Sequence, residues 1–311
     1  MTVARAVRPT DLVALVAFDG RVYPNEAKTR ERMGKADAAP HPLERALEQW
    51  FSFATGCRTW ISVKGATLRG LVSARRRGSA RAWELDCLIN AAEDDGAVCV
   101  GLLDEALRDA TRSGVEKVFL RLAAGSTILP LARKIGFTEY VREQLFSSLA
   151  PTIVPADGDA DPPLRKMQRA DELSLFHLYN AAVPEPVRRA EAVTFIEWKA
   201  AQDRHWLGRG ASQLVVERDK RVTAWLRAAV QSEVGRFDLL AHPGEPSGEA
   251  LLNLVVERLS GRSQVLTLVP KYATNLATNL LQRGFQEGPE YCVLAKRTAV
   301  TVKAHQLAHA I

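Results

Sequence analysis

Two aspartates stand at matching places in two similar stretches of this 311-residue chain. Asp86 lies within ELDCLINA (residues 84–91) and Asp238 within RFDLLAHP (residues 236–243), each flanked by apolar residues in a predicted strand. An acid in a half-buried strand is uncommon without a partner. A carboxylate placed there can take a proton from a reacting group, so we name Asp238, Asp86 and the nearby Glu84 as catalytic candidates for general-base chemistry.

Arginines close to these acids support a second interpretation, which we favour over catalysis. Asp86 and Asp238 would then be structural acids that either face solvent or pair with an arginine such as Arg81 or Arg236. The run RRR at residues 75–77, between two predicted strands, predicts a solvated hairpin tip, because charge runs are usually solvated.

A second group of candidates lies where the first of these strands leads into a predicted helix. The loop there carries the acids Glu93, Asp94 and Asp95 before Gly96. Free N–H groups and the positive end of a helix favour an anion, but each close carboxylate would repel it by about 1–4 kcal/mol. We therefore expect the acids to cap the helix and to take the place of a bound anion.

The corresponding loop of the second stretch differs in composition. The sequence AHPGEPSGEALL (residues 241–252) keeps Gly244, Ser247 and Gly248, has no arginine, and contains Pro246, which cannot donate an N–H. Two interpretations stay open. Ser247 is either simply a helix N-cap or part of a weakened anion-binding loop.

The elements that must position these residues occur twice along the chain. Four segments recur in the same order, namely RPTDLVALVAF with QRADELSLFHLY, ELDCLINA with RFDLLAHP, LLDEALRDA with LLNLVVERL, and LPLARKIGF with ATNLLQRGF. The offset falls from 160 residues between Asp11 and Asp171 to 148 residues between Gly136 and Gly284. A duplicated unit with shorter loops in its second copy explains this trend.

In each copy the apolar pattern predicts the order strand, helices, antiparallel meander, helix, strand, helix and final strands. In the first copy a second helix is expected over residues 42–54, and a hairpin-like stretch is expected to end at Leu149. The fold class is α/β (α+β): two tandem domains around a pseudo-two-fold, each a mixed, mostly antiparallel sheet with helices on both faces. The predicted parts are residues 1–150 (first domain), 151–163 (a linker rich in proline and aspartate), 164–298 (second domain) and 299–311 (tail).

Composition narrows the classes of function. The formal net charge of +6 is modest, so nucleic acid is not an expected partner, and no apolar run is long enough to cross a membrane. The first residues lack the pattern of a signal peptide, and the four cysteines have no paired spacing, which predicts reduced thiols in a cytoplasmic protein. The six histidines show no spacing typical of metal ligands.

The order of elements resembles the GNAT superfamily of acyl-CoA-dependent N-acetyltransferases, present twice. The resemblance also rests on the RPTDL-like openings, the repeated strand-then-helix unit, and the Gly-Phe pairs at residues 136–137 and 284–285. It implies that each copy parts two strands ahead of its central helix. The pantetheine arm would bond to strand backbone in that cleft, and the pyrophosphate would sit on the loop that follows.

The resemblance implies acetyl-CoA as a co-substrate and no metal. The implied cofactor-binding residues are Leu88, Ile89, Gly96 and Ala97 in the first copy and Leu240, Ala241, His242, Gly244, Ser247, Gly248 and Glu249 in the second. The arginine of the family's loop is Asp94 in the first copy, which favours the second copy as the one that binds acetyl-CoA.

The chain departs from the family's usual catalytic pattern. The tyrosine expected four residues before the Gly-Phe pair is Ala132 in one copy and Leu280 in the other. The expected asparagine is Gly125 in the first copy and Ala273 in the second. These absences argue against the standard mechanism.

Two functions from different classes follow. The leading expectation is an acyl-CoA-dependent N-acyltransferase that moves acetyl from acetyl-CoA to a small-molecule or peptide amine, with only the second copy binding the cofactor. The alternative is a catalytically inactive tandem protein that serves as a ligand-binding or protein-interaction module. The identity of the acceptor and the formation of a homodimer are left open.

Overall fold

The computed structural model describes residues 3–19, 23–33, 57–91, 96–154, 163–202, 211–231 and 233–299. Three expectations fall outside these ranges: the helix at residues 42–54, the acids Glu93, Asp94 and Asp95, and the tail beyond residue 299. They stay predictions.

Over the described residues the first half contains six strands, with helices between them. Its elements are β1 (Val3–Ala6), η1 (Pro9–Asp11), α1 (Leu12–Asp19), η2 (Arg30–Arg32), β2 (Arg58–Lys64), β3 (Thr67–Arg76), β4 (Ala82–Asn90), α3 (Ala97–Arg112), β5 (Lys117–Ala123), α4 (Ile128–Ile135) and β6 (Thr138–Ser148).

The second half repeats this order after the linker. Its elements are β7 (Leu164–Lys166), η3 (Arg169–Asp171), α5 (Glu172–Ala182), α6 (Glu185–Glu191), α7 (Phe195–Ala201), β8 (Ser212–Arg218), β9 (Arg221–Gln231), β10 (Val234–Ala241), α8 (Gly248–Arg258), β11 (Gln264–Pro270), α9 (Thr274–Gln282) and β12 (Gln286–Arg297).

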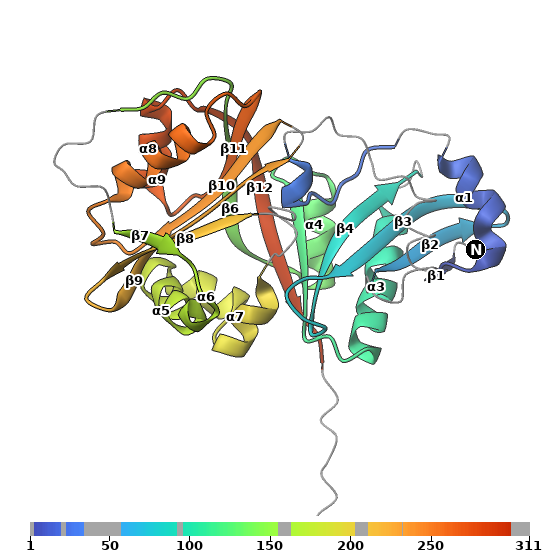
Figure 1. Cartoon of the computed structure of the whole chain (residues 1–311). Helices are drawn as coiled ribbons and strands as arrows, with labels where there is room; N and C mark the ends of the chain where they lie inside the picture. Colours follow the sequence, from blue (N-terminus) through green and yellow to red (C-terminus); the bar gives the residue numbers. More distant parts are fainter. Residues whose placement is uncertain are drawn as a thin grey trace, which may run out of the picture.

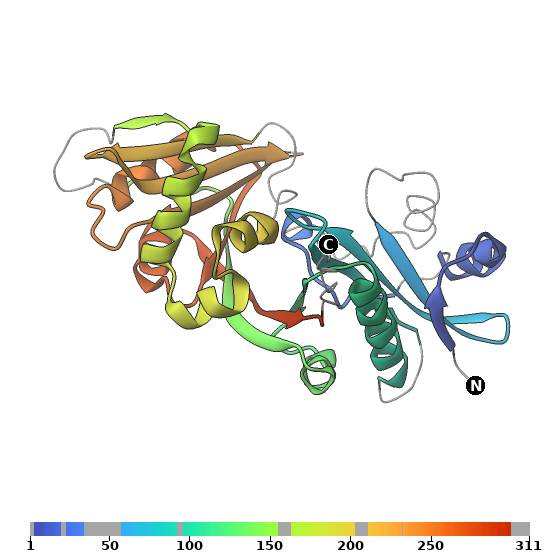
Figure 2. The ribbon, with the colours of Figure 1, turned by 90° about the horizontal axis from the view of Figure 1, so that it is seen from below.

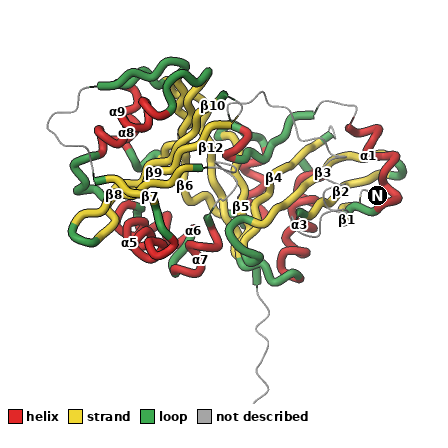
Figure 3. Tube along the Cα trace, in the orientation of Figure 1, coloured by secondary structure: helices red, strands yellow, loops and turns green. Residues whose placement is uncertain are grey.

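The strands join into one continuous sheet of twelve (Figures 1 and 3), in the order β1-β2-β3-β4-β5-β12-β6-β11-β10-β9-β8-β7. This order reads the same from both ends once each strand is matched with its repeat. The pseudo-two-fold therefore passes between β12 and β6. Each copy's last strand sits beside the other copy's fifth strand, so the copies exchange strands and share one sheet. The predicted fold class of two tandem α/β units with mostly antiparallel pairing is confirmed.

The hairpin-like stretch expected to end at Leu149 is instead the single strand β6, and that prediction is wrong. The segment TEYVREQLFSS contains no glycine, proline or asparagine that would turn the chain. β6 pairs antiparallel with β12 on one side and with β11 on the other. Its partner strands therefore come from the second half of the chain.

Helices cover both faces of the sheet in each half (Figure 2). In the second half α8 and α9 lie on one face and α5 to α7 on the other (Figure 1). Successive strand residues face opposite layers, as a pleated sheet requires. On β8, for example, Leu214 packs in the cluster that includes α8, whereas Val215 packs in the cluster that includes α5.

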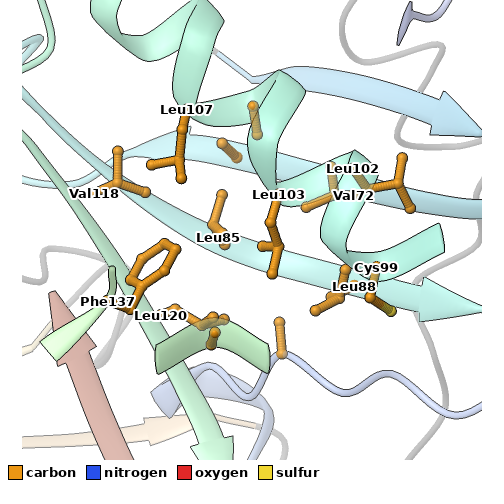
Figure 4. Packing of buried hydrophobic residues seen from close by; sticks show 14 of the residues in the cluster. Val72, Leu85, Leu88, Cys99, Leu102, Leu103, Leu107, Val118, Leu120 and Phe137 are labelled. Atoms are coloured by element: carbon orange, nitrogen blue, oxygen red, sulfur yellow. The ribbon is translucent and has the colours of Figure 1, made fainter. Parts of the chain in front are cut away.

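The central helix of the first half shows why this packing is stable. Apolar residues recur on one face of α3 and are all buried, namely Val98, Cys99, Leu102, Leu103, Ala106, Leu107 and Ala110. Several of them point at Leu85 and Leu88 of β4 and at Val118 and Leu120 of β5 (Figure 4). Each fully buried leucine contributes about 1.5–3 kcal/mol to this layer.

The internal repeat is confirmed at the level of side chains. Asp11 receives two hydrogen bonds from Arg5, at 2.7 and 2.6 Å, and one from the backbone of Arg8. Asp171 receives two from Arg165, both at 2.7 Å, and one from the backbone of Gln168. The same bidentate pair thus joins the first strand to the first helix in both copies.

Candidate functional site

The expected parting of strands is present in both copies. The parallel ladder between β4 and β5 ends at the pair Glu84 and Phe119, although both strands continue. The ladder between β10 and β11 ends likewise at Arg236 and Leu266. Residues 25–33 form a segment that we call the strap, and its first part, residues 25–28, lies in the first copy's gap beyond the last pair.

The strap bonds to both edges of the first gap as an extra backbone segment would. The Leu88 N–H donates to the side-chain oxygen of Asn25 at 2.8 Å, and the Glu26 N–H donates to the Leu88 carbonyl at 2.9 Å. On the other edge, the Lys28 N–H donates to the Arg121 carbonyl at 2.8 Å. The backbone groups that a ligand in this cleft would use are therefore taken.

Three of the four predicted cofactor-binding residues of the first copy are enclosed by protein. The side chains of Leu88 and Ile89 are buried on opposite faces of the sheet. Gly96 has a φ of +84°, and a Cβ added there would lie 2.1 Å from the Leu131 side chain. Ala97 is exposed at the first position of α3. The packing of Leu131 against residue 96 therefore explains the glycine without a bound ligand.

In the second copy, a cavity of about 170 Å³ lies where β10 and β11 have parted; we call it the central cavity. Its polar lining from the first half is Arg30, Arg77, Arg121, Tyr140 and Glu143. The second half adds Tyr179, Glu191, Gln202, Trp225, Arg227, Asp238 and Tyr272, with an apolar wall that includes Leu239, Leu240, Leu268 and Pro270. The predicted residues Asp238 and Leu240 thus face a space that both halves enclose.

A chain of alternating charges runs along the floor of this region. Glu84 pairs with Arg121 at 3.6 Å, and Arg121 donates to Glu143 at 2.9 Å. Arg30 of the strap donates to Glu143 at 2.8 Å and reaches Asp238 at 3.4 Å. Burial alone would raise the pKa of Glu143, but Arg121 and Arg30 lower it to about 2. Acids of both copies thereby belong to one ion-pair network.

The three catalytic candidates have different surroundings. Asp86 is fully buried and accepts a hydrogen bond from the Ser73 hydroxyl at 2.6 Å. Glu84, also buried, pairs with Arg75 at 2.6 Å. Asp238 pairs with Arg227 as well as with Arg30.

The two arginines suggested as partners of the aspartates bond elsewhere. Arg81 pairs with Glu116 near the surface at 3.0 Å. Arg236 is buried and donates to the carbonyls of Arg30 and Met33, both at 2.8 Å. The expected pairing of Asp238 with an arginine is present, through Arg227, which lies opposite it on β9, and through Arg30 of the strap.

The arginine run at residues 75–77 does not form a solvated tip as predicted. Only its middle residue is exposed; Arg75 pairs with Glu31 and Glu84, and Arg77 lies with its guanidinium 4.1 Å from the centre of the Phe119 ring. The turn is covered because α7 of the second half packs over it, where the Gly78 N–H donates to the Ala200 carbonyl at 2.8 Å.

Two further carboxylates of the central cavity, Glu143 and Glu191, were not predicted from the sequence. Glu191, at the end of α6, accepts from the Tyr179 hydroxyl at 3.1 Å and from the Tyr140 hydroxyl at 3.4 Å, with Arg77 at 3.8 Å. Burial and the charge of Glu191 raise the pKa of Tyr140, Tyr179 and Tyr272 above the ordinary value. These hydroxyls therefore stay protonated and can donate hydrogen bonds at neutral pH.

A groove of about 880 Å³ lies at the carboxyl end of β10, and it contains the second loop. It is lined by residues of α5, of the turn between β8 and β9, and of the loop: Ser174, His177, Leu178, Ala181, Arg218, Asp219, Arg221, Val222, Thr223, His242, Gly244 and Glu245. The predicted residues His242 and Gly244 are exposed here. Ala241 ends β10 just before them, pairing with Ala224 of β9.

The start of α8 carries an acid and an arginine from different segments. The Glu245 carboxylate accepts the Ser247 N–H at 3.1 Å, and Arg218 of β8 donates to Glu245 at 3.1 Å and to the Ser247 hydroxyl at 2.7 Å. Burial would raise the pKa of Glu245, but hydrogen bonds from Thr223, Ser247 and Arg218 lower it. Ser247 is the N-cap by position, and its side chain accepts no helix N–H.

The remaining predicted residues complete this helix start. Gly248 is the first residue of α8, and a Cβ added to it would meet no atom within 4 Å. The carbonyl of Glu249, the next residue, accepts a hydrogen bond from Arg283. Arg218 thus lies beside the start of α8, although the loop itself has no arginine.

Within the described ranges no helix is long and apolar enough to cross a membrane. The same residues contain no group of three or more His, Cys, Asp or Glu placed to hold a metal ion.

Comparison with solved structures gives the fold its place among known proteins. No family model matches the chain, and no curated protein matches it. The chain is similar to a GCN5-related N-acetyltransferase from Sphaerobacter thermophilus, with 15% identity, 95% of each chain covered and a TM-score of 0.56. It is similar to a tandem GNAT protein from the clavulanic acid biosynthesis pathway, with 12% identity over 96% of this chain and 99% of the other and a TM-score of 0.53.

A third similar structure is a GCN5-related N-acetyltransferase from Anabaena variabilis, with 11% identity, 95% of this chain and 72% of the other covered, and a TM-score of 0.52. At these identities the likeness concerns the fold. The chain therefore has the fold of tandem GCN5-related N-acetyltransferases, as the resemblance in the sequence predicted.

Proposed function

We propose that the second copy binds acetyl-CoA and transfers its acetyl group to an amine held in the central cavity. The observation that carries this proposal is the difference between the two gaps. The strap fills the first gap, whereas the second opens into the central cavity and is followed by a groove at the start of α8. A long ligand with an anionic end requires both spaces: β10 lines the central cavity, and His242, the residue after its last one, lines the groove.

The residues around α8 fit the anionic part of this co-substrate. Arg218 and the N–H groups at the helix start would hold the pyrophosphate, and Gly248 leaves room for it. Glu245 would have to leave the Ser247 N–H. The backbone of Leu239, Leu240 and Ala241 beyond the last β11 pair would take the pantetheine arm.

The bound co-substrate supplies an activated acetyl thioester, and the chain supplies proton transfer and orientation. Asp238 and Glu191 both line the central cavity and can accept the proton of the acceptor ammonium, directly or through a water. The Tyr272 hydroxyl lines the same cavity and can donate a hydrogen bond to the leaving thiolate. In this proposal Asp86 and Glu84 have structural roles, since they face the filled gap and the ion-pair network.

We keep the boundaries at residues 1–150 and 164–298 as a proposal, but as the limits of two sequence copies and not of two separate sheets. They divide the chain into its two copies, but the sheet of each copy includes the last strand of the other. We expect residues 164–298 produced alone to lack cooperative unfolding, because β11 loses its partner β6. The cytoplasmic location, a peptide or small-molecule acceptor and a homodimer remain predictions.

The proposal is tested by following the melting temperature of the full chain with acetyl-CoA. At one hundred times its dissociation constant, a ligand stabilises the folded state by about 2.7 kcal/mol. We expect Gly248→Asp to abolish the shift, because it adds a carboxylate at the anion seat without a steric clash. Ala97→Asp, the matched change at the start of α3, should leave the shift intact. No shift in the unmodified chain contradicts the proposal.

Turnover is then measured as thiol release from acetyl-CoA with a panel of small amines. We expect Asp238→Asn and Glu191→Gln to lower the rate of thiol release by different factors. The variant with the larger loss, about 10²-fold or more, identifies the general base. A chain that binds acetyl-CoA but releases no thiol with any amine or with water would favour the inactive binding module instead.

A further inference from the structure

The strap joins the filled gap of the first copy to the central cavity of the second. We propose that the first copy has the chain's own strap as its permanent ligand and uses it to place Arg30 in the acceptor site of the second copy. The role of Arg30 in this inference rests on the proposed function. The occupancy of the first gap by the strap does not. Arg30 is then a positioning residue supplied by the copy that binds no cofactor.

The anchored end of the strap is held by polar and apolar contacts together. The Asn25 side chain accepts from the Leu88 N–H and donates to the Asp86 carbonyl, at 2.8 and 3.2 Å. Ala27 is 1% exposed and packs in the same apolar cluster as Leu88. Both polar contacts are made to β4, so removing the Asn25 side chain takes partners away from buried backbone groups of that strand.

The other end of the strap is received by the second copy. Arg236, itself buried on β10, donates to the carbonyls of Arg30 and Met33. Met33 is 4% exposed and packs with Leu266 and Leu268 of β11. The strap backbone is therefore fixed on both sides of Arg30, and its guanidinium has little freedom to leave the site.

Arg30 bridges two acids that belong to different copies. It donates to Glu143 of β6 at 2.8 Å and contacts Asp238 of β10 at 3.4 and 3.5 Å. Arg227 holds Asp238 from the other side. Two guanidinium groups fix the direction of the Asp238 carboxylate, and a displacement of about 1 Å in such a group can lower a rate about a hundredfold.

The first experiment asks whether the strap occupies the gap, independently of any activity. Amide hydrogen exchange of the full chain should show the Glu26 and Lys28 N–H groups protected to the level of neighbouring strand residues. Asn25→Ala should speed their exchange at least about tenfold. Leu107→Ala, which empties a site in the α3 core of the same half, should not. Unprotected Glu26 and Lys28 amides in the unmodified chain would overturn the proposal.

The second experiment asks whether the strap acts through Arg30. The rate of thiol release from acetyl-CoA, with water or an active amine as acceptor, is compared for Arg30→Ala, Asn25→Ala, the double variant and Leu107→Ala. We expect Arg30→Ala to lower the rate about tenfold to a hundredfold, with acetyl-CoA affinity within about threefold of the unmodified chain. Arg30→Lys should restore part of the loss.

The double variant decides between coupling and mere destabilisation. If Asn25 acts by placing Arg30, the double variant loses no more activity than Arg30→Ala alone. Losses that multiply, an unchanged rate in Arg30→Ala, or an equal loss in Leu107→Ala would each overturn the proposed role. If the unmodified chain binds no acetyl-CoA, the proposed function fails, and the role of Arg30 falls with it. The occupancy of the gap is still decided by the exchange experiment.

Discussion

Replacing Glu143 by glutamine is expected to remove an acid-dependent part of the stability. Glu143 is 5% exposed, and its pKa falls from an ordinary value of 4.5 to about 2 because Arg121 and Arg30 flank it. A shift of that size corresponds to about 3 kcal/mol. Because the folded pKa is depressed, this stability is present above about pH 4.5 and is lost as the pH falls toward 2. Glu143→Gln should therefore lower the unfolding free energy by about 3 kcal/mol at pH 7.

The assay is urea unfolding of the full chain and the variant at a series of pH values. The difference between them should shrink to about half near pH 3, since the protonated acid then resembles the amide. Other carboxylates titrate in both proteins and cancel. Glu116→Gln is the control, because the exposed pair of Glu116 with Arg81 is worth at most about 1 kcal/mol. A difference that stays constant from pH 7 to pH 3 would refute the reasoning.

Two further predictions concern the fold. A Cβ on Gly78 would lie 2.1 Å from the Lys199 carbonyl oxygen, so Gly78→Ala should lower the free energy of unfolding by about 1–3 kcal/mol and the melting temperature with it. Gly125→Ala is the control, because a Cβ there meets nothing within 4 Å and should change the melting temperature little. Asp11→Ala and Asp171→Ala each remove a bidentate pair and a backbone bond, so both should cost about 1–3 kcal/mol in denaturant unfolding. A loss in only one copy would show that the two pairs are not equivalent.

The parts of the fold that the sequence predicts depend on short-range patterns. The apolar spacing of α3 and the repeated acid before each first helix lie within a few residues of one another. The parting of strands ahead of α3 and α8 followed from the repeated strand-then-helix unit and its resemblance to a known family. These features need no knowledge of which segments meet in space.

The exchange of β6 and β12 was not predictable in the same way. Both segments have strand-forming composition, but a strand pattern does not name its neighbour. The expected hairpin supplied a local partner for β6, whereas the structure supplies β11 and β12 from more than a hundred residues away. The burial of Arg77 has a similar long-range cause, because α7 of the second half packs over the turn that follows it.

The candidate site was predicted in part. Asp86 and Asp238 hold equivalent positions, yet only Asp238 lines the central cavity, because the strap fills the gap beside Asp86. The strap sequence NEAKTRERM has no period that distinguishes it from a solvated loop. A carboxylate at a helix start was expected in the first copy, where the acids lie outside the described ranges. Among the described residues it is Glu245 of the second copy that has this place.

The most direct test of the whole account is the number of acetyl-CoA molecules bound by one chain, measured by titration calorimetry of the 311-residue chain. Because one gap is filled and the other is open, we expect one acetyl-CoA site per chain. Gly248→Asp should lose this site, and Ala97→Asp should keep it. Two sites would contradict the occupancy of the first gap by the strap, and no binding would contradict the function proposed for the second copy.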